Sequence, residues 1–315
     1  MKIAFLLNSK IRKLNAVKNE IQAAFKQHDI QFFESQYAGH FFELPKQAIE
    51  QDYKIIIAIG GDGSLNEIVN GVINTYKIAD TQSANDYDWT KIAEIKIGVY
   101  PAGSGNDFVK TVYKNTQLYT LKTLIESNSS QLIDTGFVSF IDKEKQQKST
   151  RFFMNITDVG MGGETVVKKD KVPKWMGADF SYFYAITSTI ATYKNCNVKC
   201  WNDNFSWQGK VINMVVANGK YFGNGLGIAP DADVTDGKFS FVIIGDVTLM
   251  DYFKNLGTVK KCEKIQHPKV QYNQFEEINI ESCDTTKISI DMDGEFIGYA
   301  PLKLTTIPKR INFIM

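Results

Sequence analysis

Two glycine-rich turns that each contain a carboxylate are the parts of this chain best suited to do chemistry. The first, Gly60-Gly61-Asp62-Gly63, follows the apolar run 55–59, and the second, PAGSGNDF at 101–108, follows an expected strand at 95–100. Glycine lets a backbone approach a ligand closely, and a strand–turn–helix sequence points backbone N–H groups at a phosphate. An aspartate repels a bare phosphate, so we expect Asp62 to act through a divalent cation, water or a hydroxyl. A purely structural turn is the alternative.

Each turn leads into an expected helix. After the first turn, apolar residues recur at 65, 68, 69, 72 and 73, which is one face of an amphipathic helix with Ser64 as its expected N-cap. If both turns leave strands of one sheet, they face each other across a cleft. Together they predict a nucleotide site.

The first 130 residues alternate expected strands (2–7, 30–33, 55–59 and 95–100) with expected helices, which is typical of a parallel α/β sheet. Ligands of such sheets bind at the carboxyl ends of the strands. After residue 130 strands predominate, with helices expected only near 180–193 and 249–256. The expected strands are 132–141, 151–156, 211–217, 239–244, 277–280, 287–292 and 311–314. We therefore predict an α/β nucleotide-binding domain at 1–130 and a mostly β second domain, a sandwich, at 131–315.

Composition narrows the function classes. A chain of 315 residues favours two domains, and its 43% hydrophobic and 23% charged residues describe an ordinary soluble protein. The formal net charge of +1 argues against nucleic acid as a partner. Scattered histidines and four cysteines without a CxxC pattern argue against a zinc site or a disulfide framework. The apolar run at 3–7 is too short for a signal peptide, so a cytoplasmic location is expected.

The motifs GGDGSLNE and PAGSGNDF resemble the catalytic domain of the diacylglycerol kinase and sphingosine kinase family, and the soluble bacterial diacylglycerol kinases look most similar. Residues 155–164, 216–239 and 291–298 also fit this resemblance, which covers nearly the whole chain. One departure is Asn8-Ser9-Lys10-Ile11, where the family usually has Asn-Pro followed by small residues. NAD kinases and phosphofructokinases have related GGDG turns, so GGDG alone does not decide between them.

The resemblance implies ATP and Mg²⁺ as cofactors. Backbone amides at 61–64 and the helix dipole are expected to hold phosphates, while Asp62 and Asp107 hold Mg²⁺ directly or through water. For Glu67, simple stabilisation of the first helical turn is an equal alternative. The expected nucleotide contacts are Asn8, Ser35, Gly60, Gly61, Asp62, Gly63, Ser64, Asn66, Glu67, Gly103, Ser104 and Asp107.

Two further sites are implied by the resemblance. Asp293 and Glu295 flank Gly294 in what is otherwise a hairpin turn, and they are expected to reach the γ-phosphate. Asp293 is the preferred base with Glu295 assisting, although the roles are reversible and Asp62 competes for the same role. A structural Mg²⁺ is expected at the carboxylate of Asp236 with the carbonyls of Asp233 and Lys238; the alternative is a plain turn.

Lysines next to aromatic residues indicate contact with an anionic membrane surface. Lys168, Lys169, Lys171 and Lys174 precede Trp175-Met176 and the aromatic residues between 180 and 184. Core packing is the commoner role of such aromatics, so a mixed role is expected.

The resulting hypothesis is an ATP- and Mg²⁺-dependent kinase of phospholipid biosynthesis that phosphorylates a hydroxyl of a membrane lipid, with diacylglycerol favoured. Its active site is expected in the cleft between the nucleotide-binding domain and a lipid-substrate domain, and the protein in the cytoplasm, peripherally associated with the membrane. The sequence allows a homodimer. The alternatives are a soluble-metabolite kinase of the NAD kinase type and a catalytically silent nucleotide- or lipid-binding regulator.

Overall fold

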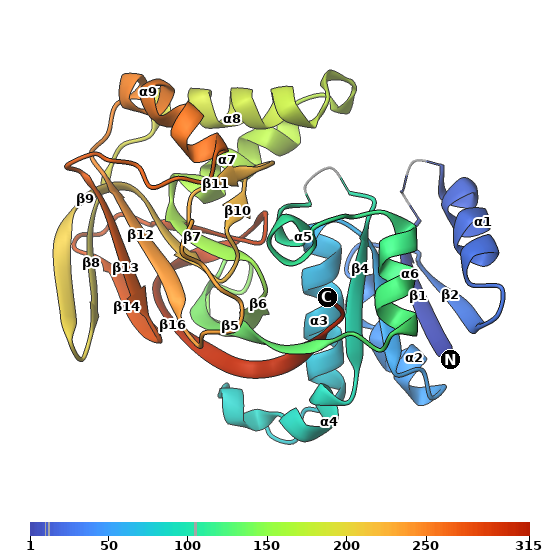
Figure 1. Cartoon of the computed structure of the whole chain (residues 1–315). Coiled ribbons are helices and arrows are strands. Elements are labelled where there is room, and N and C mark those ends of the chain that lie inside the picture. Colours follow the sequence, from blue (N-terminus) through green and yellow to red (C-terminus); the bar gives the residue numbers. More distant parts are fainter. Residues whose placement is uncertain (10, 12, 104–105) are drawn as a thin grey trace. The chain divides into compact units, whose positions relative to one another are not determined.

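A computed structural model describes residues 1–9, 11, 13–103 and 106–315, with the backbone alone at 174, 178 and 179. The chain forms two compact units: unit 1 comprises 1–134 and 308–315, and unit 2 comprises 135–307. The chain passes between the units twice, within β5 (Gln131–Asp142) and within β16 (Glu295–Phe313) (Figure 1). The last eight residues, which we expected in the second domain, therefore belong to unit 1.

Unit 1 is an α/β domain built on parallel strands. The order is β2 (Asp29–Ser35), β1 (Lys2–Asn8), β3 (Ile55–Gly60), β4 (Lys96–Pro101) and the end of β16, with parallel pairing throughout. Strand β1 is buried along both faces because helices cover both sides of the sheet. The helices are α1 (Leu14–Ala24), η1 (His40–Phe42), α2 (Leu44–Glu50), α3 (Asp62–Thr75), η2 (Ala84–Asp86), α4 (Trp89–Ala93), α5 (Asp107–Val112) and α6 (Leu118–Glu126).

The register of this sheet gathers its strand ends at one edge. Asn8 pairs with Ser35, and Gly60 pairs with Pro101, each at the carboxyl end of its strand. On one face of the sheet, Ile3, Phe5 and Leu7 pack against α1 and α6. The loops that follow the four strands are therefore held next to one another by a rigid core.

Unit 2 is β-rich and mainly antiparallel. Its path runs β13 (Val270–Phe275), β12 (Phe239–Gly245), β9 (Phe205–Ala217), β7 (Ile156–Gly160), β15 (Ser289–Met292) and β16. Its core includes Phe153, Phe239, Ile280 and Leu304. The remaining strands are β6 (Lys148–Phe153) beside β5, β8 (Cys196–Asn202) between β9 and β14, β14 (Glu277–Ser282), and the small pair β10 (Tyr221–Phe222) and β11 (Leu226–Gly227).

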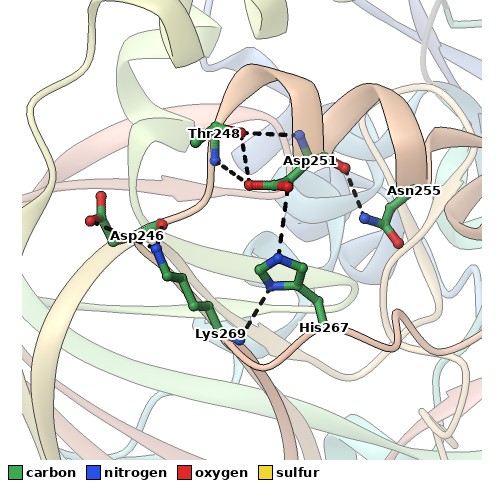
Figure 2. A network of polar contacts seen from close by, with 6 residues as sticks. All are labelled: Asp246, Thr248, Asp251, Asn255, His267 and Lys269. Atoms are coloured by element: carbon green, nitrogen blue, oxygen red, sulfur yellow. Dashed lines mark hydrogen bonds and ion pairs between the residues drawn. The ribbon is translucent and has the colours of Figure 1, made fainter.

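Three helices lie together at one end of unit 2: α7 (Met161–Lys171), α8 (Ala178–Thr192), preceded by η3 (Lys174–Met176), and α9 (Leu249–Lys260) (Figure 1). The start of α9 is fixed by a capping box, in which Asp251 N donates to Thr248 Oγ1 and Thr248 N donates to Asp251 Oδ2 (Figure 2). Within the described residues, no helix is long and apolar enough to cross a membrane.

Candidate functional site

The first glycine turn is itself the start of a helix. Helix α3 begins at Asp62 with Gly61 as its N-cap, and Leu65 N donates to Gly61 O at 3.0 Å. The expected N-cap at Ser64 is therefore wrong, because the helix already begins at Asp62 and includes Gly63 in its first turn. The first amides of a helix have no partner inside it, so the Gly61–Ser64 segment presents N–H groups at this end of α3.

The carboxylate of Asp62 joins the first turn to the second. Its Oδ2 accepts a hydrogen bond from Asp107 N (2.8 Å) and its Oδ1 accepts one from Phe108 N (3.0 Å), at the start of α5. The Asp107 carboxylate is buried and pairs with Lys110 Nζ at 2.7 Å. Asp62 and Asp107 thus both have structural partners, and their expected metal role stays a prediction.

The two turns also touch through glycine. A Cβ on Gly103 would lie 2.5 Å from Gly61 Cα, and a Cβ on Gly60 would lie 2.5 Å from Ser64 Oγ. By contrast, a Cβ on Gly63 would have nothing within 4 Å. Glycine is therefore required at positions 60 and 103, where a Cβ would collide with a neighbouring residue. At Gly63, the space beside the backbone is open. Ser104, an expected nucleotide contact in the second turn, lies outside the described residues.

The remaining expected nucleotide contacts divide into two groups. Ser35 is buried, and its hydroxyl accepts a hydrogen bond from Ser9 N at 3.4 Å, beside Asn8 at the end of β1. Asn66 is also buried, but its Oδ1 accepts a hydrogen bond from Asn70 Nδ2 at 3.2 Å, which directs it along α3. Glu67 is half-buried in the first turns of the same helix. Asn8 and Ser35 lie at the strand ends, whereas the Asn66 side chain is hydrogen-bonded within α3.

A ring stack beside Ser35 was missed by sequence reasoning. The rings of Tyr37 and His40 lie 4.4 Å apart at 12°, and His40 Nδ1 accepts a hydrogen bond from Gln36 N at 3.1 Å. An aromatic residue three positions before a histidine in a strand-end loop was the available signal.

In unit 2, Asp293 occupies the tight turn between β15 and β16. Its φ is +49° and that of Gly294 is +84°, the backbone of a two-residue hairpin. The carboxylate accepts hydrogen bonds from three amides: Met154 N (3.0 Å), Asn155 N (3.0 Å) and Ile156 N (2.9 Å). These amides compete with a substrate proton for the oxygens of Asp293, so its geometry is that of a residue that holds a turn in place.

Glu295 is the more accessible of the two expected catalytic carboxylates. Its Oε2 pairs with Arg151 Nη1 at 2.9 Å and its Oε1 lies 3.7 Å from Lys143 Nζ, while 45% of the side chain remains exposed. Sequence reasoning did not find Arg151, because it lies on β6, far from Glu295 in the chain. Two cations therefore lie beside this carboxylate.

Two buried acids lie directly opposite each other on neighbouring strands of unit 2. Asp158 on β7 is paired in register with Asp291 on β15. Burial raises the pKa of Asp158 to about 7, although the Asn213 amide opposes the shift. Burial and then the charge of Asp158 raise the pKa of Asp291 well above its ordinary value, while Lys169 opposes that shift. Sequence analysis missed this pair because single acids within strands carry no pattern.

The expected Mg²⁺ loop of unit 2 contains two aspartate turns. Asp233 Oδ1 accepts hydrogen bonds from Thr235 N (2.9 Å) and Thr235 Oγ1 (2.7 Å), and Asp236 Oδ1 accepts one from Lys238 N (2.9 Å). Both aspartates are exposed. No three His, Cys, Asp or Glu residues in the described parts of the chain are grouped to hold a metal. The donors are oxygens, which suits a hard cation, and the site stays a prediction.

Two of the four expected membrane lysines tie α7 to α8. Lys168 Nζ donates to Ser188 O (3.2 Å) and Thr192 Oγ1 (2.8 Å), and Lys169 Nζ lies 5.1 Å from the centre of the Tyr182 ring. Lys171 is exposed, and the side chain of Lys174 lies outside the described part.

Comparison with known proteins identifies the family. Residues 2–138 match the model of the diacylglycerol kinase catalytic domain, and residues 157–315 match that of the YegS C-terminal NAD kinase beta sandwich-like domain. A diacylglycerol kinase of Staphylococcus carnosus (strain TM300) is 25% identical over 89% of this chain and 82% of its own length. One of Staphylococcus haemolyticus (strain JCSC1435) is 25% identical over 85% and 72%.

The fold is shared with a solved structure. A candidate diacylglycerol kinase from Bacillus anthracis str. Sterne superimposes with a TM-score of 0.74 at 18% identity, over 99% of this chain and 97% of that one. The two domain matches together account for most of the sequence, and their order agrees with the α/β and β-rich units. The chain therefore belongs to the diacylglycerol kinase family, with a catalytic domain followed by a YegS-type C-terminal domain.

Proposed function

We propose that this protein is a lipid kinase that transfers the γ-phosphoryl group of ATP, with Mg²⁺, to a hydroxyl of a membrane lipid, and that the lipid is diacylglycerol. The observation that carries the proposal is the junction of the two turns, where the Asp62 carboxylate binds the amides of Asp107 and Phe108 while Gly103 packs on Gly61. The names of the staphylococcal relatives support the choice of lipid.

In this proposal the first turn holds phosphate. The first amides of α3 point outward from Gly61–Ser64, and the space beside Gly63 is wide enough for a ligand to approach the backbone. Bound Mg·ATP would supply the phosphoryl group and neutralise charge as that group is transferred. The protein residues bind and orient the phosphates, with Asn8 and Ser35 beside them at the strand ends. In the β-rich unit, which we propose to be a sandwich-type substrate domain, Asp236 and the carbonyls of Asp233 and Lys238 would hold the structural cation.

For the acceptor hydroxyl we propose Glu295 as the proton acceptor and Asp293 as its positioning residue. Glu295 is partly exposed and paired with Arg151, whereas Asp293 accepts hydrogen bonds from three amides. This reverses the order of preference drawn from the sequence. This assignment requires the β15–β16 turn and the glycine turns to act on one substrate.

Two other functions remain as alternatives. The family model of the C-terminal part includes NAD kinase in its description, which keeps a soluble-metabolite kinase in consideration. A silent nucleotide- or lipid-binding regulator is the other.

A turnover assay separates these functions. Purified protein is given Mg·ATP with diacylglycerol, sphingosine, phosphatidylglycerol or NAD, and the phosphorylated product is measured; omission of Mg²⁺ is the control. Phosphorylation of diacylglycerol alone supports the proposal. Phosphorylation of NAD alone, or of none of the four, contradicts it.

A further inference from the structure

One end of unit 2 displays large apolar and aromatic side chains to solvent. They are Trp175 (83% exposed), Phe180 (44%), Phe183 (47%), Tyr184 (50%), Met250 (62%) and Phe253 (45%). Phe180 stacks on Tyr184 at 6.3 Å within α8, and Phe183 of α8 lies 6.4 Å from Phe253 of α9. The two helices therefore contribute to one patch, which we call the α8–α9 surface.

Helix α9 is held in place without a buried residue. None of its twelve residues is buried, although most helices gain their stability from packing an apolar face. Its first turn is instead fixed by the Thr248–Asp251 capping box, and His267 Nε2 lies 3.8 Å from Asp251 Oδ1 (Figure 2). Polar contacts thus hold one end of α9 in place, while the side chains of Met250 and Phe253 remain exposed to solvent. Contiguous exposed patches of this kind mark interaction sites.

Lysines are more numerous than acids around the patch, and they lie at positions 168, 169, 171, 194, 254, 260, 261 and 264. Lys171 at the end of α7 and Lys254, Lys260 and Lys261 on and after α9 are all exposed. Of the nearby acids, Asp170 lies 3.4 Å from Lys169 Nζ and Asp251 is held in the capping box. Glu164, Asp246 and Glu263 are the other acids with described side chains on or beside these helices.

We propose that the α8–α9 surface docks on an anionic lipid bilayer. An amphipathic helix lies in the plane of a membrane interface with its apolar side in the headgroup region, and lysines beside it attract anionic lipid. Tryptophan and tyrosine suit this position because one end of each ring is apolar and the other is polar. The sequence pointed to the four lysines between 168 and 174 and to the aromatic residues that follow them. Lys168 and Lys169 hold α8, and the α9 residues come from the structure alone. The inference does not depend on which hydroxyl compound the protein phosphorylates.

The test is sedimentation of the full-length protein with vesicles of phosphatidylcholine, with or without 30% phosphatidylglycerol, chosen as about one-third anionic lipid. We expect binding to the anionic vesicles only. The double variant Met250→Gln/Phe253→Asn should lower the partition coefficient by roughly tenfold or more. The two polar side chains gain no hydrophobic free energy when they move from water into the membrane interface. Lys254→Gln/Lys260→Gln should lower it by about 25-fold, or about fivefold for each lysine.

Matched controls come from unit 1. Tyr119→Asn removes an aromatic side chain that is 76% exposed on α6, and Lys46→Gln/Lys91→Gln removes two exposed lysines. These controls should bind vesicles like the wild type, and all variants should melt at the wild-type temperature. Equal losses in controls and α8–α9 variants, or equal binding to both kinds of vesicle, overturn the proposal.

A self-interface is distinguished by sedimentation velocity without lipid. A wild-type dimer that Phe253→Asn converts to a monomer would assign the surface to a second copy of the chain and overturn lipid docking. Turnover of a short-chain, water-soluble diacylglycerol should be unchanged in every docking variant. Failure of that turnover in the wild type, with vesicle binding as expected, would defeat the kinase proposal and leave the docking surface standing.

Discussion

Asp158 and Asp291 face each other across the β7–β15 ladder, two carboxyl groups side by side in the interior of unit 2. Asp158 is 2% exposed, and Asp291 Oδ1 is buried without a hydrogen-bond partner among the described residues. Two adjacent buried acids cannot both ionise cheaply, so at least one proton is expected to stay on the pair.

This pair makes stability depend on pH. The pKa of Asp158 is about 7 in the folded protein, above its ordinary value of 3.8, so the folded state keeps a proton that the unfolded state releases. The contribution to stability is therefore complete below about pH 4 and is lost as pH rises through about 7. Asp158→Asn should remove a slope of up to ~1.4 kcal/mol per pH unit between these values.

Urea unfolding at pH 4.5, 6 and 7.5 measures this slope. Asp170→Asn, which removes an exposed carboxylate from α7, is the matched control and should leave the slope unchanged. Identical slopes in the wild type and Asp158→Asn would show that the acid pair does not titrate with folding.

The contact between the glycine turns gives a paired test of the nucleotide site. Gly103→Ala places a Cβ 2.5 Å from Gly61 Cα, so it should cost about 1–3 kcal/mol of stability and lower ATP affinity. Gly63→Ala meets nothing within 4 Å and lies in the first turn of α3, so stability should stay the same or rise by about 0.5–1 kcal/mol. Its ATP affinity should still fall, because phosphate is expected there. Unchanged calorimetric ATP binding by Gly63→Ala would place the phosphates elsewhere.

Asp62 can be tested for its two roles separately. Asp62→Ala leaves the amides of Asp107 and Phe108 without their carboxylate, and should lower the free energy of unfolding by about 1–2 kcal/mol. Asp62→Asn retains one acceptor oxygen and should lose less. If Asp62 also serves Mg²⁺, Asp62→Asn will need more Mg²⁺ for half-maximal turnover. A normal Mg²⁺ requirement would limit Asp62 to joining the two turns.

The two carboxylates of the β15–β16 turn should behave differently. Glu295→Gln should lower kcat by about two to four orders of magnitude with the melting temperature unchanged, as expected for loss of a proton acceptor. Asp293→Asn leaves part of the Met154–Ile156 amide cluster without acceptors and should cost about 1–3 kcal/mol of stability. A stable, inactive Asp293→Asn alongside an active Glu295→Gln would restore Asp293 as the base.

The sequence was most informative where periodicity and glycine spacing coincide. The expected strands at 2–7, 55–59 and 95–100 correspond to β1, β3 and β4, because buried parallel strands appear as continuous apolar runs. The two-domain organisation and the family were also predicted correctly.

Helix α7 was not predicted, since its first turn contains two glycines, which are poor helix formers. The structure explains these glycines by tertiary contact. A Cβ at Gly162 would collide with the Asp158 carboxylate, and one at Gly163 would lie 2.7 Å from Ser289 Cβ. Contacts between residues distant in the chain also account for the hidden roles of Asp62, Arg151 and Lys168. A residue pattern within one segment of the sequence cannot predict such contacts.

The return of residues 308–315 to unit 1 affects when that unit can form during synthesis. Asn312 and Phe313 pair with Lys96 and Ile97 of β4, and the Phe313 ring lies 5.4 Å from Phe108, in the first turn of the helix that Asp62 caps. Unit 1 thus lacks a strand and the aromatic contact of Phe313 until the rest of the chain has been translated. A ribosome-bound chain that ends before residue 308 would carry both glycine turns on an unfinished sheet.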